Sequence, residues 1–182
     1  MIMDLQGKKV LFADLDGTLI QTASGKTFAE DCTDFRIRKD VLDKIKCMDN
    51  LSFLHIVTNQ GGIPQHISKK DFETKLWGIA SFIQAYMNSR RANVSEDGDV
   101  EVSFDYCMSL DKDNPNRKPN TGMLQALFEN KLKWAPSYIK DKANILMIGD
   151  ASGKEGQFSD SDKKCAENFG IDYLDVEDFL KA

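Results

Sequence analysis

Short apolar runs alternate along the chain with longer segments of helical periodicity. The apolar runs predict buried strands over residues 8–13, 51–57, 100–108 and 144–148, with an edge strand around Tyr173. The segments of helical spacing predict helices over residues 38–48, 68–89, 121–133 and 160–169. Alternation of this kind favours an α/β fold in which helices cover both faces of a mostly parallel sheet.

Two segments stand outside this alternation. Residues 19–35, between the first strand and the first helix, carry Gly25 and alternating side chains, which predicts a small β-hairpin flap and no large cap domain. Residues 90–98 are polar and predict a loop before the third strand. The sequence shows no repeat, low-complexity tract or interdomain linker, so we expect residues 1–182 to form a single domain.

The charge of the chain limits the class of partner. Its 182 residues carry a formal net charge of −5, from 24 Lys and Arg against 29 Asp and Glu. A protein that coats nucleic acid non-specifically needs a strongly basic surface, so this balance argues against that class. It leaves open a protein that touches only a nucleic-acid end.

Apolar runs and cysteines bear on the compartment. No apolar run reaches the roughly 18 residues that cross a membrane, and the N-terminus lacks a signal-peptide core. The cysteines, at positions 32, 47, 107 and 165, are too scattered for a zinc site or a disulfide framework, which favours reduced thiols. We therefore expect a cytoplasmic protein, or a nuclear one in a eukaryote, without a membrane partner.

Polar side chains follow three of the predicted strands at the point where each strand ends. Asp14 and Asp16 end the first strand, Thr58 and Asn59 the second, and Asp150 the fourth. The carboxyl ends of parallel strands meet at one edge of a sheet, and ligands bind there at the switch in strand order. Three carboxylates at that edge would repel one another without a hard cation, and an all-oxygen ligand set favours Mg²⁺.

These groups suit phosphoryl transfer. A carboxylate beside a metal can attack phosphorus and form an aspartyl-phosphate, and a second carboxylate two residues on can protonate the leaving oxygen. Lys118, on the loop after the third strand, can bring an ammonium to the same edge. Together with the Thr58 hydroxyl it would stabilise the charge on the phosphoryl oxygens.

The same residues resemble a known superfamily. Four segments resemble, in order and spacing, the motifs of the haloacid dehalogenase (HAD) phosphatases: D-L-D-G-T-L at 14–19, V-T-N-Q at 57–60, R-K-P-N-T-G-M at 117–123 and I-G-D at 148–150. The resemblance implies a Rossmannoid, doubly wound fold.

The resemblance also implies a role for each matching residue. Asp14 would be the nucleophile and Asp16 the general acid and base. Thr58 and Lys118 would bind the transferring phosphoryl group, and Asp14, the Asp16 carbonyl and Asp150 would hold Mg²⁺.

Further segments narrow the resemblance to the phosphatase domain of polynucleotide kinase 3′-phosphatases. They are S-G-K-T-F at 24–28, D-F-R-I at 34–37, T-N-Q-G-G-I at 58–63, G-D-A-S-G-K at 149–154 and F-S-D-S-D at 158–162. The resemblance implies removal of a 3′-phosphate from a DNA or RNA end, a place in DNA repair, and a separate kinase or ligase as a partner. We also expect Asn59 and Arg117 to contact substrate.

Two motifs depart from simple patterns. The second acidic residue of the last HAD motif matches Asp162, with Asp160 as a rival, because the G-K-E-G-Q-F-S segment separates either from Asp150. Its role as an outer metal partner or lysine partner is therefore open. The S-G-K-T string at 24–27 resembles the end of a phosphate-binding loop, but Ile20 replaces the required first glycine, which favours a turn in the flap.

Alternative functions remain. A phosphatase of small metabolites, such as sugar or histidinol-type phosphates, would use the same residues. A phosphoacceptor signalling domain would instead use an aspartate near the third strand, such as Asp105 or Asp111. An inactive module that binds nucleic-acid ends is disfavoured because every motif residue is intact. The oligomeric state is not indicated.

Overall fold

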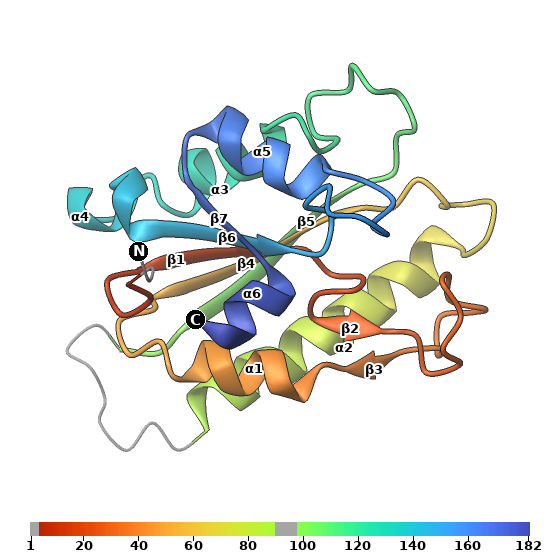
Figure 1. Ribbon diagram of the computed structural model, residues 1–182, viewed down its shortest axis with the longest axis horizontal. Coiled ribbons are helices and arrows are strands. Elements are labelled where there is room, and N and C mark those ends of the chain that lie inside the picture. The colour runs from red at the N-terminus through yellow and green to blue at the C-terminus, as the bar shows by residue number, and fades with distance from the viewer. Residues whose placement is uncertain (1–3, 90–97) are drawn as a thin grey trace.

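Five parallel strands form the centre of the structure, a computed structural model that describes residues 4–89 and 98–182 (Figure 1). The strands are β1 (Val10–Ala13), β4 (Phe53–Asn59), β5 (Glu101–Cys107), β6 (Ile145–Gly149) and β7 (Asp172–Asp175). They lie in the order β5-β4-β1-β6-β7, and neighbouring strands are parallel throughout. The expected α/β fold is therefore confirmed. Most of the loop predicted over residues 90–98 lies outside the described residues.

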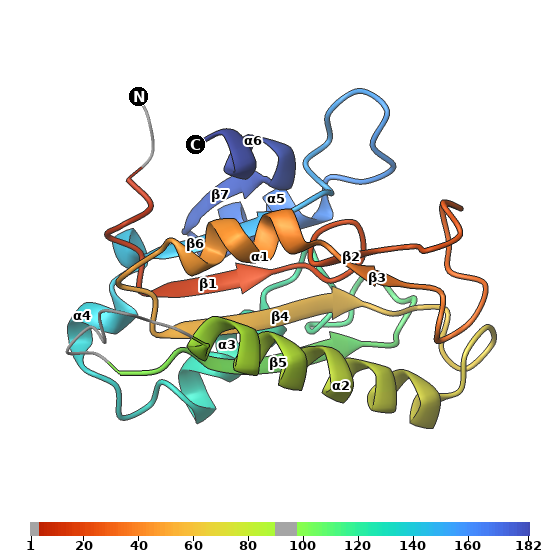
Figure 2. The same cartoon turned by 90° about the horizontal axis from the view of Figure 1, so that it is seen from below.

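Helices cover both faces of this sheet (Figure 2). One face carries α1 (Lys39–Lys46), α2 (Lys69–Asn88) and α6 (Val176–Lys181), and the other carries α3 (Gly122–Asn130), α4 (Ser137–Lys140) and α5 (Ser161–Phe169). A 3₁₀ turn (Lys142–Asn144) leads into β6. Side chains alternate along the strands between these two faces. Leu11 therefore packs in the core beneath α1, α2 and α6, and Phe12 packs in the core beneath α3, α4 and α5.

The direction of chain travel reverses beside β1. From β1 the chain moves outward to β4 and β5, and then returns to place β6 and β7 on the other side of β1. The crevice between the carboxyl ends of β1 and β6 is therefore the switch point at which such sheets bind ligands. Asp14 directly follows β1 and Asp150 directly follows β6.

The flap is a short antiparallel hairpin at this same end of the molecule (Figure 1). Its strands β2 (Ile20–Gln21) and β3 (Arg36–Ile37) pair, so the second strand lies just beyond the predicted range 19–35. Asp34 accepts hydrogen bonds from the backbone and hydroxyl of Ser24, both at 2.7 Å, and ties the S-G-K-T segment into a turn. In the described part of the chain this hairpin is the only sheet outside the central one, and no large cap is present.

The limits of two predicted elements differ for identifiable reasons, and one short helix was not predicted. β4 begins later than predicted. It also ends later, because Thr58 and Asn59 pair with the last residues of β5. The helix predicted over 121–133 ends at Asn130, where the Leu127 carbonyl accepts from both following amides and the chain turns to bury Leu132. The four-residue α4 was too short to give a periodic signal.

Two expectations concern the surface and the cysteines. In the part of the chain that the structure describes, no helix has the length and apolar character to cross a membrane. All four cysteines are free thiols, as expected.

Candidate active site

Three carboxylates converge at the switch point between β1 and β6. Asp14, Asp150 and Asp162 each place a carboxylate oxygen within 4.8 Å of the other two. Asp162 lies in the first turn of α5 and is 1% exposed. Asp160 instead faces outward, with its side chain 45% exposed and paired to Lys164 at 2.6 Å. The structure thus brings Asp162, and not Asp160, to the two strand-end acids.

Two glycines make room for these carboxylates. A Cβ on Gly17 would lie 2.0 Å from Oδ2 of Asp150, and a Cβ on Gly149 would lie 2.2 Å from Oδ2 of Asp162. Gly17 also has a φ of +79°, which favours glycine. The glycines of the D-L-D-G-T-L and I-G-D segments are therefore part of the cluster, because any side chain there would displace an acid.

Lys118 lies inside the cluster and is 3% exposed. Its ammonium contacts Oδ1 of Asp14 at 2.5 Å and Oδ1 of Asp162 at 2.7 Å, and donates to the Val57 carbonyl at 2.8 Å. The side-chain amide of Asn59 accepts from the backbone N–H of Lys118 and donates to its carbonyl, both at 3.0 Å. Asn59, expected to contact substrate, thus holds the backbone that carries the lysine.

Asp16 lies at the rim of the cluster and is exposed. Its carboxylate accepts a hydrogen bond of 2.7 Å from Nε2 of Gln60, which also donates to the Thr58 hydroxyl oxygen at 2.9 Å. The Asp16 carboxylate is not part of the three-acid group. Gln60 ends the V-T-N-Q segment but was not a predicted site residue. Its side-chain amide bridges Asp16 and Thr58, which gives the glutamine of this segment a structural role.

Burial and mutual repulsion set the charges of these groups. Burial raises the pKa of Asp14 well above its ordinary value, and Asp162 and Asp150 raise it further, against the opposing pull of Lys118. Burial and the neighbouring Asp162 raise the pKa of Asp150 to about 6. Burial alone would lower the pKa of Lys118, but Asp14 and Asp162 outweigh it and raise that pKa, which keeps the ammonium charged.

This donor set suits a hard divalent cation. The cluster offers only carboxylate oxygens, and a single ammonium leaves it short of positive charge. Burial is the main cause of the raised pKa values of Asp14 and Asp150, and repulsion between the neighbouring carboxylates adds to it. A cation with oxygen ligands, such as Mg²⁺, would relieve that repulsion.

The loop between Asp150 and Asp162 is closed by a residue that the sequence analysis did not identify. Asp175, at the end of β7, accepts hydrogen bonds from the Ser152 hydroxyl at 2.8 Å and the Gln157 amide at 2.7 Å, and pairs with Lys154 at 3.0 Å. Burial acts to raise the pKa of Asp175, but these donors lower it to about 2.

The closure explains how a distant acid reaches the site. Ser152 and Gln157 of the inserted segment are held by Asp175, and α5 then begins at Ser161, close to the end of β6. Ala151 donates its backbone N–H to Oδ2 of Asp162 at 3.1 Å, which joins the two ends of the loop.

The remaining candidates lie outside the cluster. Arg117 is half-buried and donates to the Ser109 carbonyl at 2.7 Å, on the loop that follows β5. Asp105 contacts Nε2 of His55 at 3.1 Å, and the exposed Asp111 accepts from the backbone of its own turn. Neither aspartate belongs to the three-acid group found among the described residues.

Comparisons with known proteins agree with this geometry. Residues 9–180 match the family model described as polynucleotide kinase 3 phosphatase. A bifunctional polynucleotide phosphatase/kinase of Schizosaccharomyces pombe is 32% identical over 177 residues, which cover 95% of this chain and 38% of that protein. A polynucleotide 3′-phosphatase of Saccharomyces cerevisiae is 27% identical over 97% of this chain and 89% of its own length.

A solved structure shares the fold. A protein of Mesorhizobium loti described as a HAD-like phosphatase superposes with a TM-score of 0.57 at 21% identity, over 90% of this chain and 69% of that one. The chain spans about two fifths of the length of the bifunctional relatives from S. pombe and mimivirus, 38% and 41% respectively.

Proposed function

Because this chain belongs to the polynucleotide kinase 3 phosphatase family, we propose that it is a phosphoric monoester hydrolase that removes the 3′-phosphate from DNA or RNA ends. The observation that carries the proposal is the convergence of Asp14, Asp150 and Asp162, two of which, Asp14 and Asp162, pair with one buried lysine. A single ammonium cannot balance three neighbouring carboxylates. A bound metal ion would balance them, as in metal-assisted phosphoryl transfer.

Mg²⁺ fits the cluster, with Asp14, Asp150 and the Asp16 carbonyl as its holders and Asp162 as the partner of Lys118. When bound, the ion supplies positive charge that lets an anionic phosphate approach an anionic carboxylate. The chain's own residues then orient the groups that react.

In the first step the carboxylate of Asp14 attacks phosphorus. A bond forms between a carboxylate oxygen and phosphorus while the bond from phosphorus to the ester oxygen breaks. Lys118 and the Thr58 hydroxyl donate to the phosphoryl oxygens, and Asn59 positions Lys118 for this role. Asp16 gives its proton to the departing ester oxygen, in an orientation fixed by Gln60.

In the second step water hydrolyses the aspartyl-phosphate. Asp16, now ionised, accepts a proton from the water as its oxygen bonds to phosphorus and the Asp14–phosphorus bond breaks. Phosphate leaves, and both carboxylates return to their starting states. One exposed and one buried aspartate, two residues apart, thus perform the two different tasks.

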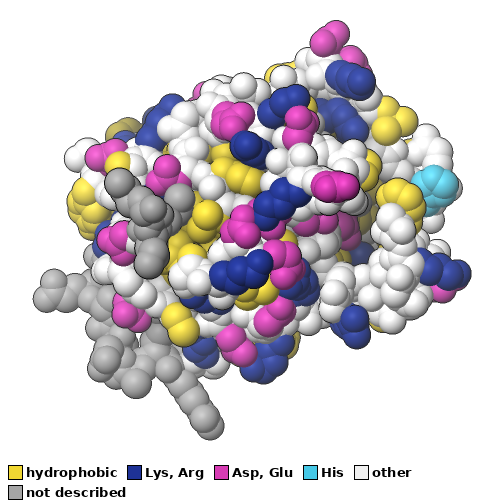
Figure 3. All heavy atoms as spheres, viewed as in Figure 1, with side chains coloured by type: hydrophobic (Ala, Val, Ile, Leu, Met, Phe, Trp, Pro, Cys, Tyr) yellow, Lys and Arg dark blue, Asp and Glu magenta, His cyan; other side chains and the backbone are white. Residues whose placement is uncertain are grey.

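The surroundings of the site favour a polymer end over a small metabolite. The small flap leaves the edge of the sheet accessible, and acidic and basic side chains intermingle over the face in Figure 3. A surface of mixed charge suits a few contacts near one end better than non-specific coating of a duplex. The name of the S. pombe relative also pairs this chemistry with a kinase, so we expect a kinase or ligase to act on the same ends.

A phosphate-release panel tests the proposal. The substrates are 3′-phosphorylated DNA and RNA oligonucleotides, their 5′-phosphorylated counterparts, and sugar and histidinol phosphates, each with and without Mg²⁺. We expect turnover of the 3′-phosphorylated ends with Mg²⁺, lost in Asp14→Asn and retained in Asp111→Asn. No turnover of 3′-ends would refute the proposed substrate, and faster turnover of a metabolite would establish the alternative phosphatase.

A further inference from the structure

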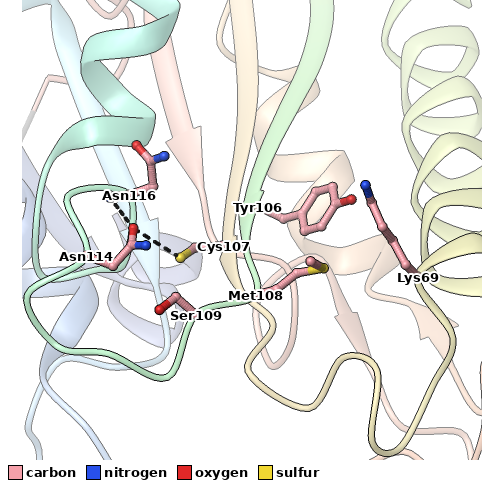
Figure 4. Close-up of a pocket in the computed structure, with 7 residues that line it drawn as sticks. All are labelled: Lys69, Tyr106, Cys107, Met108, Ser109, Asn114 and Asn116. Carbon is pink, nitrogen blue, oxygen red and sulfur yellow. Dashed lines mark hydrogen bonds between the residues drawn. The ribbon is translucent and has the colours of Figure 1, made fainter.

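A cavity lies at the carboxyl end of the outermost strand β5, the end of the sheet at which the three acids also lie (Figure 4). Its volume is about 300 Å³, and its walls come from three places: the start of α2, the end of β5 and the loop that leads to Lys118. The lining residues are Lys69, Tyr106, Cys107, Met108, Ser109, Asn114 and Asn116. None of them is used in the proposed chemistry.

One wall offers a fixed aromatic ring and a cation. The hydroxyl of Tyr106 donates to Glu73 at 2.6 Å, and its ring packs edge-on against Phe72 with centroids 5.1 Å apart. Both contacts hold the ring to α2. Lys69 reaches toward the same ring in Figure 4, and its side chain is 57% exposed. Its ammonium pairs with Glu73 at 3.7 Å, and an exposed pair of this kind contributes little to stability. The ammonium is therefore available to a phosphate.

The opposite wall offers amide groups from a stable loop. Asn114 accepts from the backbone N–H of Asn116 at 2.9 Å, and its own carbonyl accepts from Asn120 at 2.8 Å. A Cβ on Gly122 would lie 2.3 Å from the Asn116 side chain, so the loop packs directly on the start of α3. Such a loop presents polar groups in a set position.

The cavity connects to the catalytic acids through short contacts. The carbonyl of Cys107 accepts from the backbone N–H of Gln60 at 2.7 Å, and Gln60 in turn donates to Asp16. Arg117, the residue before Lys118, donates a hydrogen bond of 2.7 Å to the carbonyl of Ser109 in the cavity wall. β5 is two strands from β1, a separation of about 10 Å. A strand advances about 3.4 Å per nucleotide in a duplex and further when it is extended, so this separation corresponds to at most about three nucleotides.

We propose that this cavity binds one nucleotide of a single-stranded polynucleotide, a few positions upstream of the phosphorylated end. The base stacks on Tyr106, Lys69 contacts a backbone phosphate, and the amides of the opposite wall contact sugar or base edges. The volume is at the lower limit of ligand pockets, which fits one nucleotide and excludes a duplex. The inference rests on the proposed function, since it assumes a polynucleotide substrate.

Two measurements test the subsite. The first is kcat/KM for 3′-phosphorylated substrates of one to five nucleotides, taken as the ratio of the pentanucleotide to the mononucleotide within each variant. The second is the Kd of a 5′-fluorescent tetranucleotide with a 3′-hydroxyl, which needs no catalysis. We expect a ratio of about tenfold or more in the unaltered chain, because stacking on an aromatic ring contributes about 1–3 kcal/mol per base.

Four variants separate stacking from folding. Tyr106→Leu should reduce the length ratio to nearly one and weaken the Kd about tenfold, whereas Tyr106→Phe should retain both. Lys69→Glu, at an exposed position, should weaken the Kd as well. Trp77→Leu is the matched control: an exposed aromatic residue on α2 that packs on Phe104, outside the cavity. It should leave both values within about twofold.

The outcomes are distinguishable from those of the proposed function. A length ratio near one in the unaltered chain, or a Kd that Tyr106→Leu and Lys69→Glu leave unchanged, would overturn the subsite while phosphate release continued. If Tyr106→Leu fails to fold, the Lys69→Glu result alone decides. Loss of tetranucleotide binding in these variants, without phosphate release from any substrate, would support the subsite and refute the phosphatase.

Discussion

The two sides of the catalytic edge are built on opposite plans. On the side of β1, β6 and β7, several charged groups are buried and paired, as Lys118 between Asp14 and Asp162 illustrates. On the side of β5 and the flap, the polar groups are exposed, and a cavity remains between α2 and the loop before Lys118. The loop between Asp150 and Asp162, on the first side, is held by hydrogen bonds to the buried Asp175.

This difference separates chemistry from substrate choice. Moving a buried charge leaves its partners unpaired in a medium of low dielectric, so substitutions on the closed side should be costly and affect all substrates alike. Exposed groups keep water as an alternative partner, so substitutions on the open side should be mild and depend on the substrate.

Lys118→Met should have the largest effect. It removes the ammonium that pairs with two buried carboxylates and that, in the proposed mechanism, binds the phosphoryl group. We therefore expect kcat to fall about 10²–10³-fold and the free energy of unfolding to fall by about 3–5 kcal/mol. Phosphate release and chemical denaturation measure the two. Lys112→Met, on the exposed loop nearby, is the control. A variant with near-normal kcat would contradict the role of the closed side.

Asp175→Ala should loosen the loop between the acids. Without its hydrogen bonds to Ser152 and Gln157, we expect Asp150 and Asp162 to be held less firmly and the Mg²⁺ concentration for half-maximal activity to rise about tenfold or more. A Mg²⁺ titration of activity measures this. Asp178→Ala is the matched control, because Asp178 pairs with Lys154 on the surface without contacting the loop's interior. Equal effects of the two variants would argue against the closure.

Metal-free protein should lose stability as the pH rises. Asp14 and Asp150 have raised pKa values, that of Asp150 about 6, so between the ordinary value and the raised one the folded chain binds more protons than the unfolded chain. The stability that protonation provides is complete below about pH 4 and is lost as the pH passes 6.

Thermal unfolding in EDTA measures this loss. Discounted for solvent exposure, the Asp150 contribution is about 1 kcal/mol, or roughly 2–4 °C in Tm. We expect a higher Tm near pH 5 than near pH 7.5, with the difference reduced by Mg²⁺ and by Asp150→Asn but not by Asp49→Asn at an exposed site. A Tm that rises over this interval would contradict the charge shortage in the cluster.

Asp34→Ala should have the smallest effect. Its carboxylate holds the flap through Ser24 and the backbone of Glu30, and these donors, Glu30 first, lower the pKa of Asp34 to about 2. On an exposed hairpin we expect only about a twofold loss of kcat/KM for oligonucleotides, and none for a mononucleotide. Glu30→Ala, which loses only a surface pair, is the control. A loss of kcat/KM of more than tenfold would contradict the distinction between the exposed flap and the buried acids.

Local signals in the sequence predict most of the sheet and the strand-end acids. Asp14, Asp16 and Asp150 follow apolar runs directly, so knowing the strands was sufficient to place them. Asp162 was ambiguous because the length of the inserted segment hides which acid returns to the sheet. Contacts between distant residues resolve that choice, because Asp162 pairs with Lys118 and accepts from the backbone of Ala151. The cavity beside Tyr106 likewise depends on how a loop packs on α3, which no local pattern encodes.

A covalent trap of the reaction tests the central assignment most directly. A 3′-³²P-labelled oligonucleotide is mixed with the protein and Mg²⁺, the reaction is stopped in acid within the first turnover, and the labelled peptide is sequenced. We predict label on the peptide that contains Asp14, absent in Asp14→Asn. Label on Asp111, or full phosphate release by Asp14→Asn, would contradict the account.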